Sequence, residues 1–351
     1  MGLRRFTGRR LWRGCLLALS PVLLTLLALE VYVLAVEHEG SLPLPPLVGN
    51  FPRVVSSLGA GPSAGAFTFA IVGDTKSMGT FERLWSELPK RRLAFGVLLG
   101  DCAYGGTEPD HRYLRAEWAT ELALPFPVFY VVGNHDVSED RFPIPRFEET
   151  YGPSIFSFEY SGCLFVVLRT LKHPASNRQN VEFLRALIEK SPGKYRKRFV
   201  FMHMPPSVCG EFTGRKFDQE QEIMSLVRQM GADFVFAGDF HGYGQVQRNG
   251  VTYVVTGGGG AHLRQKIGGV HHAVLVTVSE DSVSQQLVAV PRSEEIEDRL
   301  ERFAISEVSP WMRANMPAVV VLNAVGLVWI WLCATSVSGA LRALRRHQRA
   351  C

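Results

Sequence analysis

Five short polar motifs, each directly after an apolar run, constrain this chain more than any other feature. They are Gly73-Asp74, Gly-Asp-x-x-Tyr over residues 100–104, Gly-Asn-His-Asp over residues 133–136, Met-His-Met-Pro-Pro over residues 202–206 and Gly-Asp-Phe-His over residues 238–241. Short apolar runs bounded by turn residues are typical of buried strands. Loops after such strands carry the sites of α/β folds, and glycine permits the sharp turns that they need. The motifs therefore predict polar loops gathered at the strand ends of an α/β fold.

Strand-like and helix-like segments alternate along the middle of the chain. Apolar runs predict strands over residues 67–72, 93–99, 127–132, 199–202 and 234–237. Helical spacing predicts helices over residues 80–90, 112–122, 180–190, 219–229 and, as a charged helix, 294–302. Beyond Asp239 the segments 243–247, 251–256, 273–279 and 282–290 read as strands, with a hairpin signal at residues 248–250. Because this half looks antiparallel, we expect a second sheet within an α/β layered fold.

Two long apolar runs have the length and composition of membrane-spanning helices. The first covers residues 14–36, interrupted by Pro21 and Glu30, and the second covers residues 317–341, with Asn323 as its most polar interior residue. Each approaches the roughly 20 residues that cross a bilayer. Arginines lie on the outer side of both runs, so the positive-inside rule places both termini in the cytoplasm. The middle of the chain would then lie on the periplasmic or lumenal side of the membrane.

Each apolar run also has an alternative interpretation. The first could be a cleaved signal peptide, although its apolar stretch exceeds the usual ~7–15 residues and no small-x-small cleavage site precedes Glu37. The second could be a buried core helix, although its length and trailing arginines favour a span. The predicted order is a basic cytoplasmic segment (1–13), a transmembrane helix (14–36), a Pro/Gly-rich tether (37–66), the α/β domain (67–291), a juxtamembrane helix (292–316), a second transmembrane helix (317–341) and a basic cytoplasmic tail (342–351).

Charge and cysteine content weigh against two other classes of protein. The chain has a net charge of +5, but nine arginines lie in its two end segments, so the remainder carries −4. A basic nucleic-acid surface is not expected from this balance. Outside the apolar runs and the terminus only Cys102, Cys163 and Cys209 remain, an odd number at irregular spacing. This pattern predicts neither a disulfide framework nor a zinc–thiolate site.

The side chains of the five motifs are metal ligands. Aspartate, asparagine, histidine and tyrosine suit Mn, Fe or Zn, and two such ions about 3.5–4 Å apart clamp a phosphate and lower the pKa of a bound water. Over about residues 67–263 the motifs resemble the calcineurin-like metallophosphoesterase superfamily, and more closely its purple-acid-phosphatase branch. The resemblance implies an α/β fold built as a β-sandwich of two mixed sheets flanked by helices, here with a transmembrane helix at each end. It also implies two divalent or mixed-valence ions, with Mn or Fe favoured over Zn.

The resemblance gives each motif residue a role. The implied ligands of the first metal are Asp74, Asp101, Tyr104 and His241. The implied ligands of the second metal are Asp101, which would bridge both ions, Asn134, His203 and Asp239. His135 would be the general acid or phosphate-binding histidine, and Asp136 would orient it by accepting its ring N–H.

Two positions depart from the family's pattern. Many members have histidine at position 76, where this chain has Lys76, and Tyr104 could supply the missing ligand. Lys76 would then contact the substrate phosphate or remain solvated. Asp239 stands where the family usually has histidine. Its carboxylate either binds the second metal and shifts preference from Zn toward Mn, Fe or Mg, or leaves that metal weak or absent.

A glycine run over residues 257–260 follows the last motif. It could present backbone N–H groups to a phosphate or form a tight turn. His262, just beyond it, would lie near the site as a substrate contact or on the surface.

The expected function is hydrolysis of a phosphate mono- or diester by a metal-bound hydroxide at the membrane, without a covalent enzyme intermediate. A nearby bilayer makes a lipid- or envelope-linked phosphate attractive, and the two end spans also resemble membrane phosphoesterases that remodel GPI anchors. A spacer of thirty residues (37–66) would equally serve soluble phosphates. The alternative is a degenerate member that binds a ligand or partner without catalysis, supported by positions 76 and 239. A nuclease is disfavoured by the domain charge.

Overall fold

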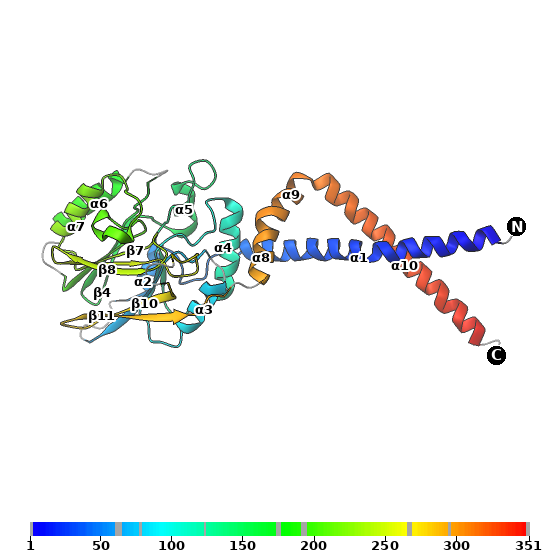
Figure 1. Ribbon diagram of the computed structural model, residues 1–351, viewed down its shortest axis with the longest axis horizontal. Helices are drawn as coiled ribbons and strands as arrows, with labels where there is room; N and C mark the ends of the chain where they lie inside the picture. The colour runs from blue at the N-terminus through cyan, green and yellow to red at the C-terminus, as the bar shows by residue number, and fades with distance from the viewer. Residues whose placement is uncertain are drawn as a thin grey trace. The chain divides into compact units, whose positions relative to one another are not determined.

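The computed structural model describes residues 3–59, 65–76, 79–122, 124–172, 177–190, 195–264, 269–293 and 296–348. The chain divides into two compact units, one made of Met1–His38 with Phe303–Cys351 and the other of Glu39–Arg302. The second unit is a two-sheet domain that carries the polar motifs, and the first contains the long helices α1 (Leu3–Gly40) and α10 (Met316–Gln348) (Figure 1).

Two mixed sheets form the domain. The five-stranded sheet has the order β11-β10-β1-β2-β3, and its strands are β1 (Phe67–Val72), β2 (Gly96–Leu98), β3 (Val128–Tyr130), β10 (His271–Val278) and β11 (Val283–Val290). The six-stranded sheet has the order β4-β5-β6-β7-β9-β8, and its strands are β4 (Phe156–Tyr160), β5 (Cys163–Val167), β6 (Lys197–Met202), β7 (Phe234–Ala237), β8 (Tyr243–Arg248) and β9 (Val251–Thr256). In the six-stranded sheet the parallel strands β5, β6, β7 and β9 are central and are flanked by the antiparallel strands β4 and β8. In the five-stranded sheet the parallel strands β1, β2 and β3 end at one edge, and the antiparallel strands β10 and β11 lie on the other side of β1.

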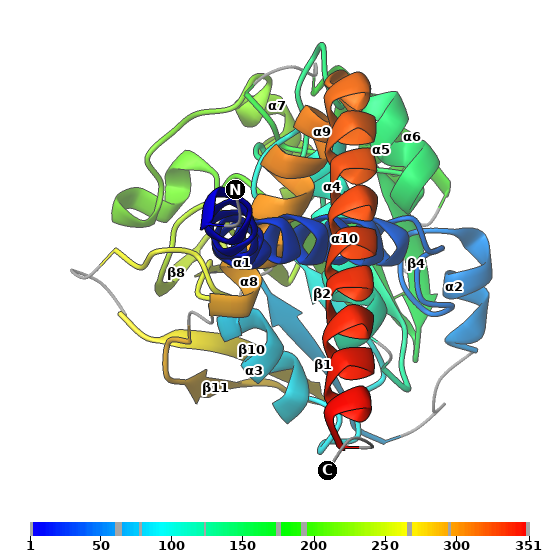
Figure 2. The same cartoon turned by 90° about the vertical axis from the view of Figure 1, so that its right-hand side faces the viewer.

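Alternation along the strands builds a layered core. Phe69 of β1 packs between the sheets against aromatic residues such as Phe165 and Phe199, whereas its neighbour Ala70 belongs to the cluster beneath the outer helices. Successive side chains of a strand point to opposite faces, so one strand serves both layers. Helices α6 (Arg178–Lys190) and α7 (Glu220–Gln229) lie on the side of the sandwich opposite to α3 (Gly79–Glu87) (Figures 1 and 2).

The remaining helices are shorter or lie at the edges of the layers. They are α2 (Pro52–Ser57), α4 (Glu108–Glu121), α5 (Ile144–Tyr151), the 3₁₀ helix η1 (Ser207–Phe212), α8 (Ile296–Phe303), the π-helical turn η2 (Ala304–Val308) and α9 (Ser309–Ala314). Helix α4 begins with an N-cap, because the Thr107 side chain accepts the backbone N–H of Asp110. Its Leu114 and Trp118 pack in the same cluster as Phe81 of α3.

The predicted two-sheet sandwich flanked by helices is confirmed, with three differences in detail. The hairpin of β4 and β5 and the helix α5 were not predicted. The hairpin turns at Ser161 and Gly162, whose φ angles are both positive. Ser-Gly is a dipeptide typical of turns. The strands beyond Asp239 do not form a sheet of their own. β8 and β9 extend the sheet of β7, and β10 and β11 extend the sheet of β1.

The segment predicted as a free tether, residues 37–66, is partly helical and partly docked on the domain. Helix α1 continues to Gly40, and Val48 forms a bridge with Val128 at the edge of β3. Asn50 is 2% exposed, accepts the backbone N–H of Tyr130, and donates to the carbonyl oxygens of Tyr130 and Pro153. These contacts tie the middle of the expected spacer, around Val48 and Asn50, to the folded domain.

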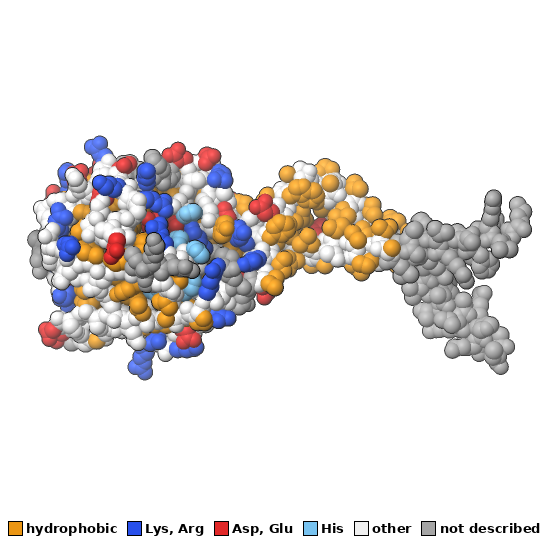
Figure 3. All heavy atoms as spheres, in the orientation of Figure 1, with side chains coloured by type: hydrophobic (Ala, Val, Ile, Leu, Met, Phe, Trp, Pro, Cys, Tyr) orange, Lys and Arg blue, Asp and Glu red, His pale blue; other side chains and the backbone are white. Residues whose placement is uncertain are grey.

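In the helical unit, two segments are long and apolar enough to cross a membrane, Ala18–Gly40 and Met316–Thr335. Hydrophobic side chains cover the surface of these helices where they are described (Figure 3). The polar interruptions seen in the sequence pair with each other, because Asn323 Nδ2 donates to Glu30 Oε1 at 2.8 Å. A Cβ added at Gly326 would lie 3.3 Å from Leu27, which shows that the two helices contact each other closely.

We predict that Asn50→Ala lowers the free energy of unfolding of the domain by about 2–3 kcal/mol, because it leaves buried groups of Tyr130 and Pro153 without partners. Urea unfolding followed by tryptophan fluorescence measures the change. The exposed neighbour Ser56→Ala is the matched control and should change stability by less than about 0.5 kcal/mol. Equal stability of the Asn50→Ala and wild-type proteins would contradict docking of this segment.

Candidate metal centre

The polar motifs lie in loops that follow parallel strands of both sheets. β1, β2 and β3 are parallel neighbours in one sheet, and β6 and β7 are parallel neighbours in the other. The fourth motif begins at the last residue of β6, and each of the others begins one to three residues after its strand ends. Carboxyl ends of parallel strands meet at one edge of a sheet. The two sheets therefore deliver their motifs to a common region.

Each of three aspartates follows a glycine and has a left-handed backbone. The φ angle is 57° at Asp74, 52° at Asp101 and 59° at Asp239. This conformation costs a non-glycine residue of order 1–3 kcal/mol and persists where the surroundings impose it. The preceding glycines are required by close packing, since a Cβ at Gly100 would lie 2.7 Å from His203 Nδ1. The repeated Gly-Asp turn thus directs three carboxylates into one volume.

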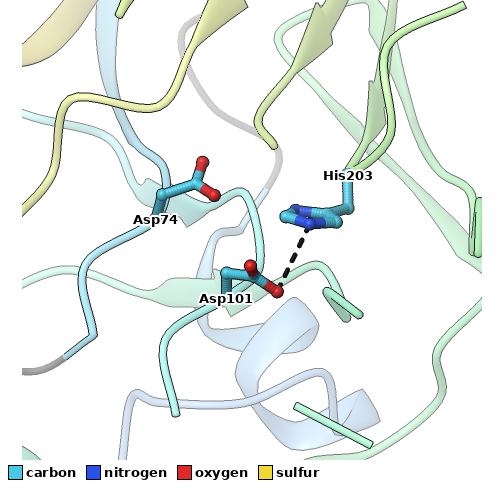
Figure 4. A group of neighbouring side chains, drawn as sticks. All are labelled: Asp74, Asp101 and His203. Carbon is cyan, nitrogen blue, oxygen red and sulfur yellow. Dashed lines mark ion pairs between the residues drawn. The ribbon is translucent and has the colours of Figure 1, made fainter. Parts of the chain in front are cut away.

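Asp74, Asp101 and His203 face one another at the centre of this volume (Figure 4). One ligand atom of each lies within 4.8 Å of the other two, and all three residues are buried. His203 Nε2 lies 3.3 Å from Asp101 Oδ1. Asp239 is buried as well. Buried carboxylates are stable only beside cations or hydrogen-bond donors, so a bound cation would stabilise this group.

The ring of His203 is fixed by its neighbours. Its Nδ1–H donates to the carbonyl oxygen of Leu99 at 2.7 Å, which directs Nε2 toward the centre. Around Nε2 lie Asn134 Oδ1 at 3.1 Å, Asp101 Oδ1 at 3.3 Å and Asp239 Oδ1 at 3.9 Å. Burial would lower the pKa of His203, but the nearby carboxylates, Asp101 first among them, raise it to about 9. A metal ion at Nε2 would have to displace that proton.

Asp74 and His241 form a second group of donors. Asp74 Oδ1 lies 3.5 Å from His241 Nε2 and is buried without a hydrogen-bond partner among the described residues, while Oδ2 accepts the backbone N–H of Asp239. His241 Nδ1–H donates to the carbonyl oxygen of His262 at 2.7 Å. Burial raises the pKa of Asp74, and the contact with Asp74 raises the pKa of His241. Asp74 Oδ1 and His241 Nε2 are thus two donors that could bind the same cation.

Asp136 makes different contacts from those expected. Its buried carboxylate accepts the backbone N–H groups of Asp101 at 2.8 Å, Gly133 at 2.6 Å and Ala103 at 2.9 Å. Within the described part of the chain it forms no hydrogen bond with the ring of His135. Asp136 therefore fixes the loops of the second and third motifs to each other, and orientation of the His135 ring by Asp136 is not what the structure describes.

The ring of His135 lies at the exposed side of the group. Its backbone N–H donates to Asp101 Oδ1 at 2.8 Å, and its ring Nε2 lies 3.9 Å from Asp101 Oδ2. The side chain is 49% exposed. Burial lowers the pKa of His135 against the opposing effect of Asp101. A molecule that approaches the carboxylates from solvent would meet this ring.

The other predicted site residues differ in how closely they approach the carboxylates. Lys76 is not solvated, since its Nζ lies 3.2 Å from Asp101 Oδ2 and its side chain is 13% exposed. Tyr104 is 43% exposed, its ring lies beneath the guanidinium of Arg302 at 3.8 Å, and among the described residues it makes no hydrogen bond to the carboxylates. Metal ligation by Tyr104 thus stays a prediction. The side chain of His262 is exposed at the rim.

The glycine run 257–260 packs against the first motif. The N–H of Gly259 donates to the carbonyl oxygen of Gly73, and the N–H of Ala261 donates to that of Asp74, both at 2.8 Å. A Cβ at Gly257 would lie 2.6 Å from Asp74 Oδ2. Of the two sequence interpretations, the tight turn agrees with these contacts.

Two residues near the centre were missed by the sequence analysis. Arg215 lies 3.0 Å from Asp239 Oδ1 with its side chain 44% exposed, and its signal in the sequence is a basic pair in the loop after the fourth motif. His111 is buried in α4, where its Nε2–H donates to the carbonyl oxygen of Asp136 and its Nδ1 accepts from the Tyr151 hydroxyl, both at 2.8 Å. The sequence around His111 gives no sign of this role.

The donor set fits a metal ion. Four donors bound at about 2.0–2.2 Å in a tetrahedron lie about 3.3–3.6 Å apart, and the oxygens around His203 Nε2 lie 3.1–3.9 Å from it. Asp74 Oδ1, which is buried and has no hydrogen-bond partner among the described residues, supports the same conclusion. The candidate ligands that the structure brings together are Asp74, Asp101, Asn134, His203, Asp239 and His241.

A buried acid–histidine group at the strand ends of a two-sheet sandwich defines the metallophosphoesterase class. The sequence agrees, because residues 67–243 match the calcineurin-like phosphoesterase family. The chain belongs to that family. A search among curated proteins found no match.

Solved structures share this fold at low sequence identity. GAP50, the anchor in the inner membrane complex of Plasmodium, is 11% identical with a TM-score of 0.51, over 69% of this chain and 95% of that chain. A dimetal phosphatase from Danio rerio is 15% identical with a TM-score of 0.48, over 65% of this chain and 99% of that chain. PhoD is 11% identical with a TM-score of 0.46, over 73% of this chain and 79% of that chain. At these identities the likeness concerns the fold alone.

We predict that His111 makes the domain sensitive to mild acid. Burial lowers the pKa of His111 to about 3, against about 6.5 in an unfolded chain. Between these values the unfolded chain binds more protons, so the free energy of unfolding falls as pH drops below about 6.5, by up to about 1.4 kcal/mol per unit. His111→Gln has no titrating ring, so it should lose about 1 kcal/mol less than wild type between pH 7 and about pH 5.5.

Urea unfolding at the two pH values tests this expectation. His262→Gln, which removes an exposed ring, is the control and should keep the wild-type loss. The same acid-induced loss in His111→Gln and wild type would show that His111 does not contribute.

Proposed function

We propose that this protein is a membrane-anchored, metal-dependent phosphoesterase that hydrolyses a phosphate mono- or diester. The observation that carries the proposal is the buried group of Asp74, Asp101 and His203 at the strand ends of a calcineurin-like phosphoesterase domain. Carboxylate oxygens and imidazole nitrogens suit Mn, Fe or Zn. The donors form two adjoining half-sites that share Asp101, one with His203 and the other with Asp74 and His241.

Metal chemistry explains why such a group would serve phosphate esters. Bound ions would lower the pKa of a water molecule and offset negative charge on the phosphate oxygens. Asp101, Asn134, His203 and Asp239 would hold one ion, and Asp74 with His241 would contribute to a second. Asp136 keeps the loops of the second and third motifs in register through its three backbone contacts.

His135 is positioned to act on the leaving group. Its half-exposed ring faces Asp101 from the solvent side, so an ester bound at the centre would place its departing oxygen near this ring. The ring would donate a proton to that oxygen as the bond to phosphorus breaks. Arg215, which reaches Asp239 from the surface, can also approach a phosphate oxygen, because its side chain is partly exposed.

The rest of the substrate would lie in a cavity beside the glycine run. This cavity has a volume of about 300 Å³, and its lining includes His262, His271 and Arg292 together with Val270 and Val290. The His262 carbonyl accepts the ring N–H of His241, so the cavity wall joins directly to the candidate ligands. Basic and apolar groups together suit an ester that carries a second anionic group or a partly apolar part.

The two apolar helical segments support anchoring in a membrane. Both are long enough to span a bilayer, and many of their apolar side chains are exposed, for example Val31 at 67% and Leu327 at 68%. Basic residues lie beyond the outer end of each segment. Under the positive-inside rule, both termini would be cytoplasmic and the domain would act on the periplasmic or lumenal side. A lipid- or envelope-linked phosphate would be within reach there.

A second candidate function is a binding module without catalysis. The observation that favours it is that two of the carboxylates already have basic partners, Lys76 on Asp101 and Arg215 on Asp239. GAP50, whose fold is similar, is described as an anchor. In this case the domain would bind a ligand or partner at the membrane and leave esters intact.

We predict metal-dependent turnover of aryl phosphates by the full chain in detergent. The protein would be stripped with a chelator, reloaded with Mn²⁺ or Fe²⁺ and assayed with an aryl monoester and an aryl diester. Asp101→Asn should lose about 100-fold or more in kcat/KM, because loss of even an outer support of a metal ligand costs about 10–100-fold. The monoester-to-diester ratio would indicate the substrate class.

Glu280→Gln, in the exposed turn between β10 and β11, is the control and should behave as wild type. Turnover that survives both chelation and Asp101→Asn would show that the ester is cleaved elsewhere. A folded protein that binds metal but cleaves neither ester would favour the binding module.

We also predict the orientation of the chain in the membrane. A reporter that becomes active only outside the cytoplasm should be active when inserted in the exposed turn at residues 280–281 and inactive when fused after Cys351. The opposite pattern would reverse the proposed topology.

A further inference from the structure

Lys76 is held beside the carboxylate that would bridge two metal ions. Its Nζ lies 3.2 Å from Asp101 Oδ2, and its backbone N–H donates to the carbonyl oxygen of Asp101. The side chains of Lys76 and Asp101 are only 13% and 3% exposed. Side chain and main chain of Lys76 are thus both tied to Asp101, which fixes a positive charge at this carboxylate.

The half-site around His203 is complete without Lys76. Asp101 contributes its other oxygen, Oδ1, and Asn134 and Asp239 contribute one oxygen each, at 3.1–3.9 Å from His203 Nε2. These spacings agree with four donors around one ion. The hydrogen bond to Leu99 holds the imidazole in place.

The half-site around Asp74 is poorer in donors. Asp74 Oδ1 and His241 Nε2 lie 3.5 Å apart, but the Oδ2 oxygen of Asp101 faces the Lys76 ammonium. Position 76 offers an ammonium, which has no lone pair for a metal. Tyr104, the remaining expected ligand, is partly exposed and stacked beneath Arg302. Two donors, together with an Asp101 oxygen that is already paired with an ammonium, make a weak cation site.

We propose that this protein binds one metal ion tightly, at Asp101, Asn134, His203 and Asp239, and that the Lys76 ammonium supplies the second positive charge that a second tight ion would otherwise provide. Charge balance agrees with this arrangement. One divalent ion and Lys76 supply three positive charges beside the three carboxylates Asp74, Asp101 and Asp239, whereas a second divalent ion would add two more next to the Lys76 ammonium in a buried volume.

Arg215 provides a matched comparison, because it also pairs with a candidate ligand. Its guanidinium lies 3.0 Å from Asp239 Oδ1, but its side chain is 44% exposed and approaches from the surface. An exposed arginine can release the carboxylate and turn to solvent at little cost. Lys76, which is nearly buried, cannot do so. Removal of the Arg215 charge should therefore leave the number of tight ions unchanged.

The experiment counts metal ions in the full chain and is independent of hydrolysis, although it rests on the proposed metal site. Detergent-solubilised protein is stripped with a chelator, titrated calorimetrically with Mn²⁺, and desalted for elemental analysis. Wild type should retain about one equivalent, with an uncoupled Mn²⁺ EPR signal. Lys76→His, which restores the family's ligand, should retain about two equivalents and give an exchange-coupled signal. Lys76→Met should strengthen second-site binding by about tenfold or more, because a neighbouring like charge is removed.

Arg215→Met should stay at one equivalent. Two equivalents of similar affinity in wild type would overturn the inference, and so would a single equivalent in both Lys76 variants with the second site as weak as in wild type. The two variants differ in size and chemistry, so misfolding of one leaves the other decisive. If no variant binds Mn²⁺ at all, the proposed metal site fails together with the inference. If metal counts are as expected and no ester is cleaved, only the proposed hydrolysis fails.

Discussion

Mutual repulsion among three buried carboxylates is the constraint on which this domain depends. Asp74, Asp101 and Asp239 come from three different strand ends and share one volume that excludes most water. Like charges at such separations are unstable unless cations or donors accompany them. The protein provides several positively charged groups. They include the imidazole of His203, whose pKa is raised by the carboxylates, the ammonium of Lys76 and the guanidinium of Arg215. Metal binding would add to, or compete with, these internal cations.

The fold supplies the rigidity that holds this group together. The space between the sheets is filled by stacked and edge-to-face phenylalanines, for example Phe165 with Phe199 at 5.1 Å between ring centroids. Close-packed interiors have low compressibility, so the strand ends above them keep fixed positions. Glycine at each turn then lets the loops approach one another without collision. The same strands therefore fill the core with their side chains and hold the polar loops at their ends.

Sequence alone predicted the family, the two sheets and the candidate ligands that cluster, because each rests on a local pattern of an apolar run followed by Gly-Asp, Gly-Asn-His-Asp or Met-His. It did not predict relations that depend on tertiary contacts. These relations join residues that are far apart in the chain. They are the sheets that β8 to β11 join, the docking of Asn50 on the domain, the hydrogen bond of His111 to Asp136 and the contact of Arg215 with Asp239. For Lys76 the sequence allows either substrate contact or a solvated side chain, and in the structure its ammonium pairs with Asp101. Glu30 and Asn323, which interrupt the two apolar runs in the sequence, are likewise hydrogen-bonded to each other in the structure.

The left-handed aspartates also have a consequence for the lifetime of the protein. Three strained turns and the mutual repulsion of buried carboxylates lower the stability of the folded chain, so a cation bound at the centre would offset this cost. An ion that binds only the folded state would shift the folding equilibrium by RT ln(1 + [L]/Kd), about 2.7 kcal/mol at a hundredfold excess over Kd. Since a change of about 1–2 kcal/mol can alter cellular abundance several-fold, metal supply in the compartment of the domain would govern how much of this protein escapes proteolysis.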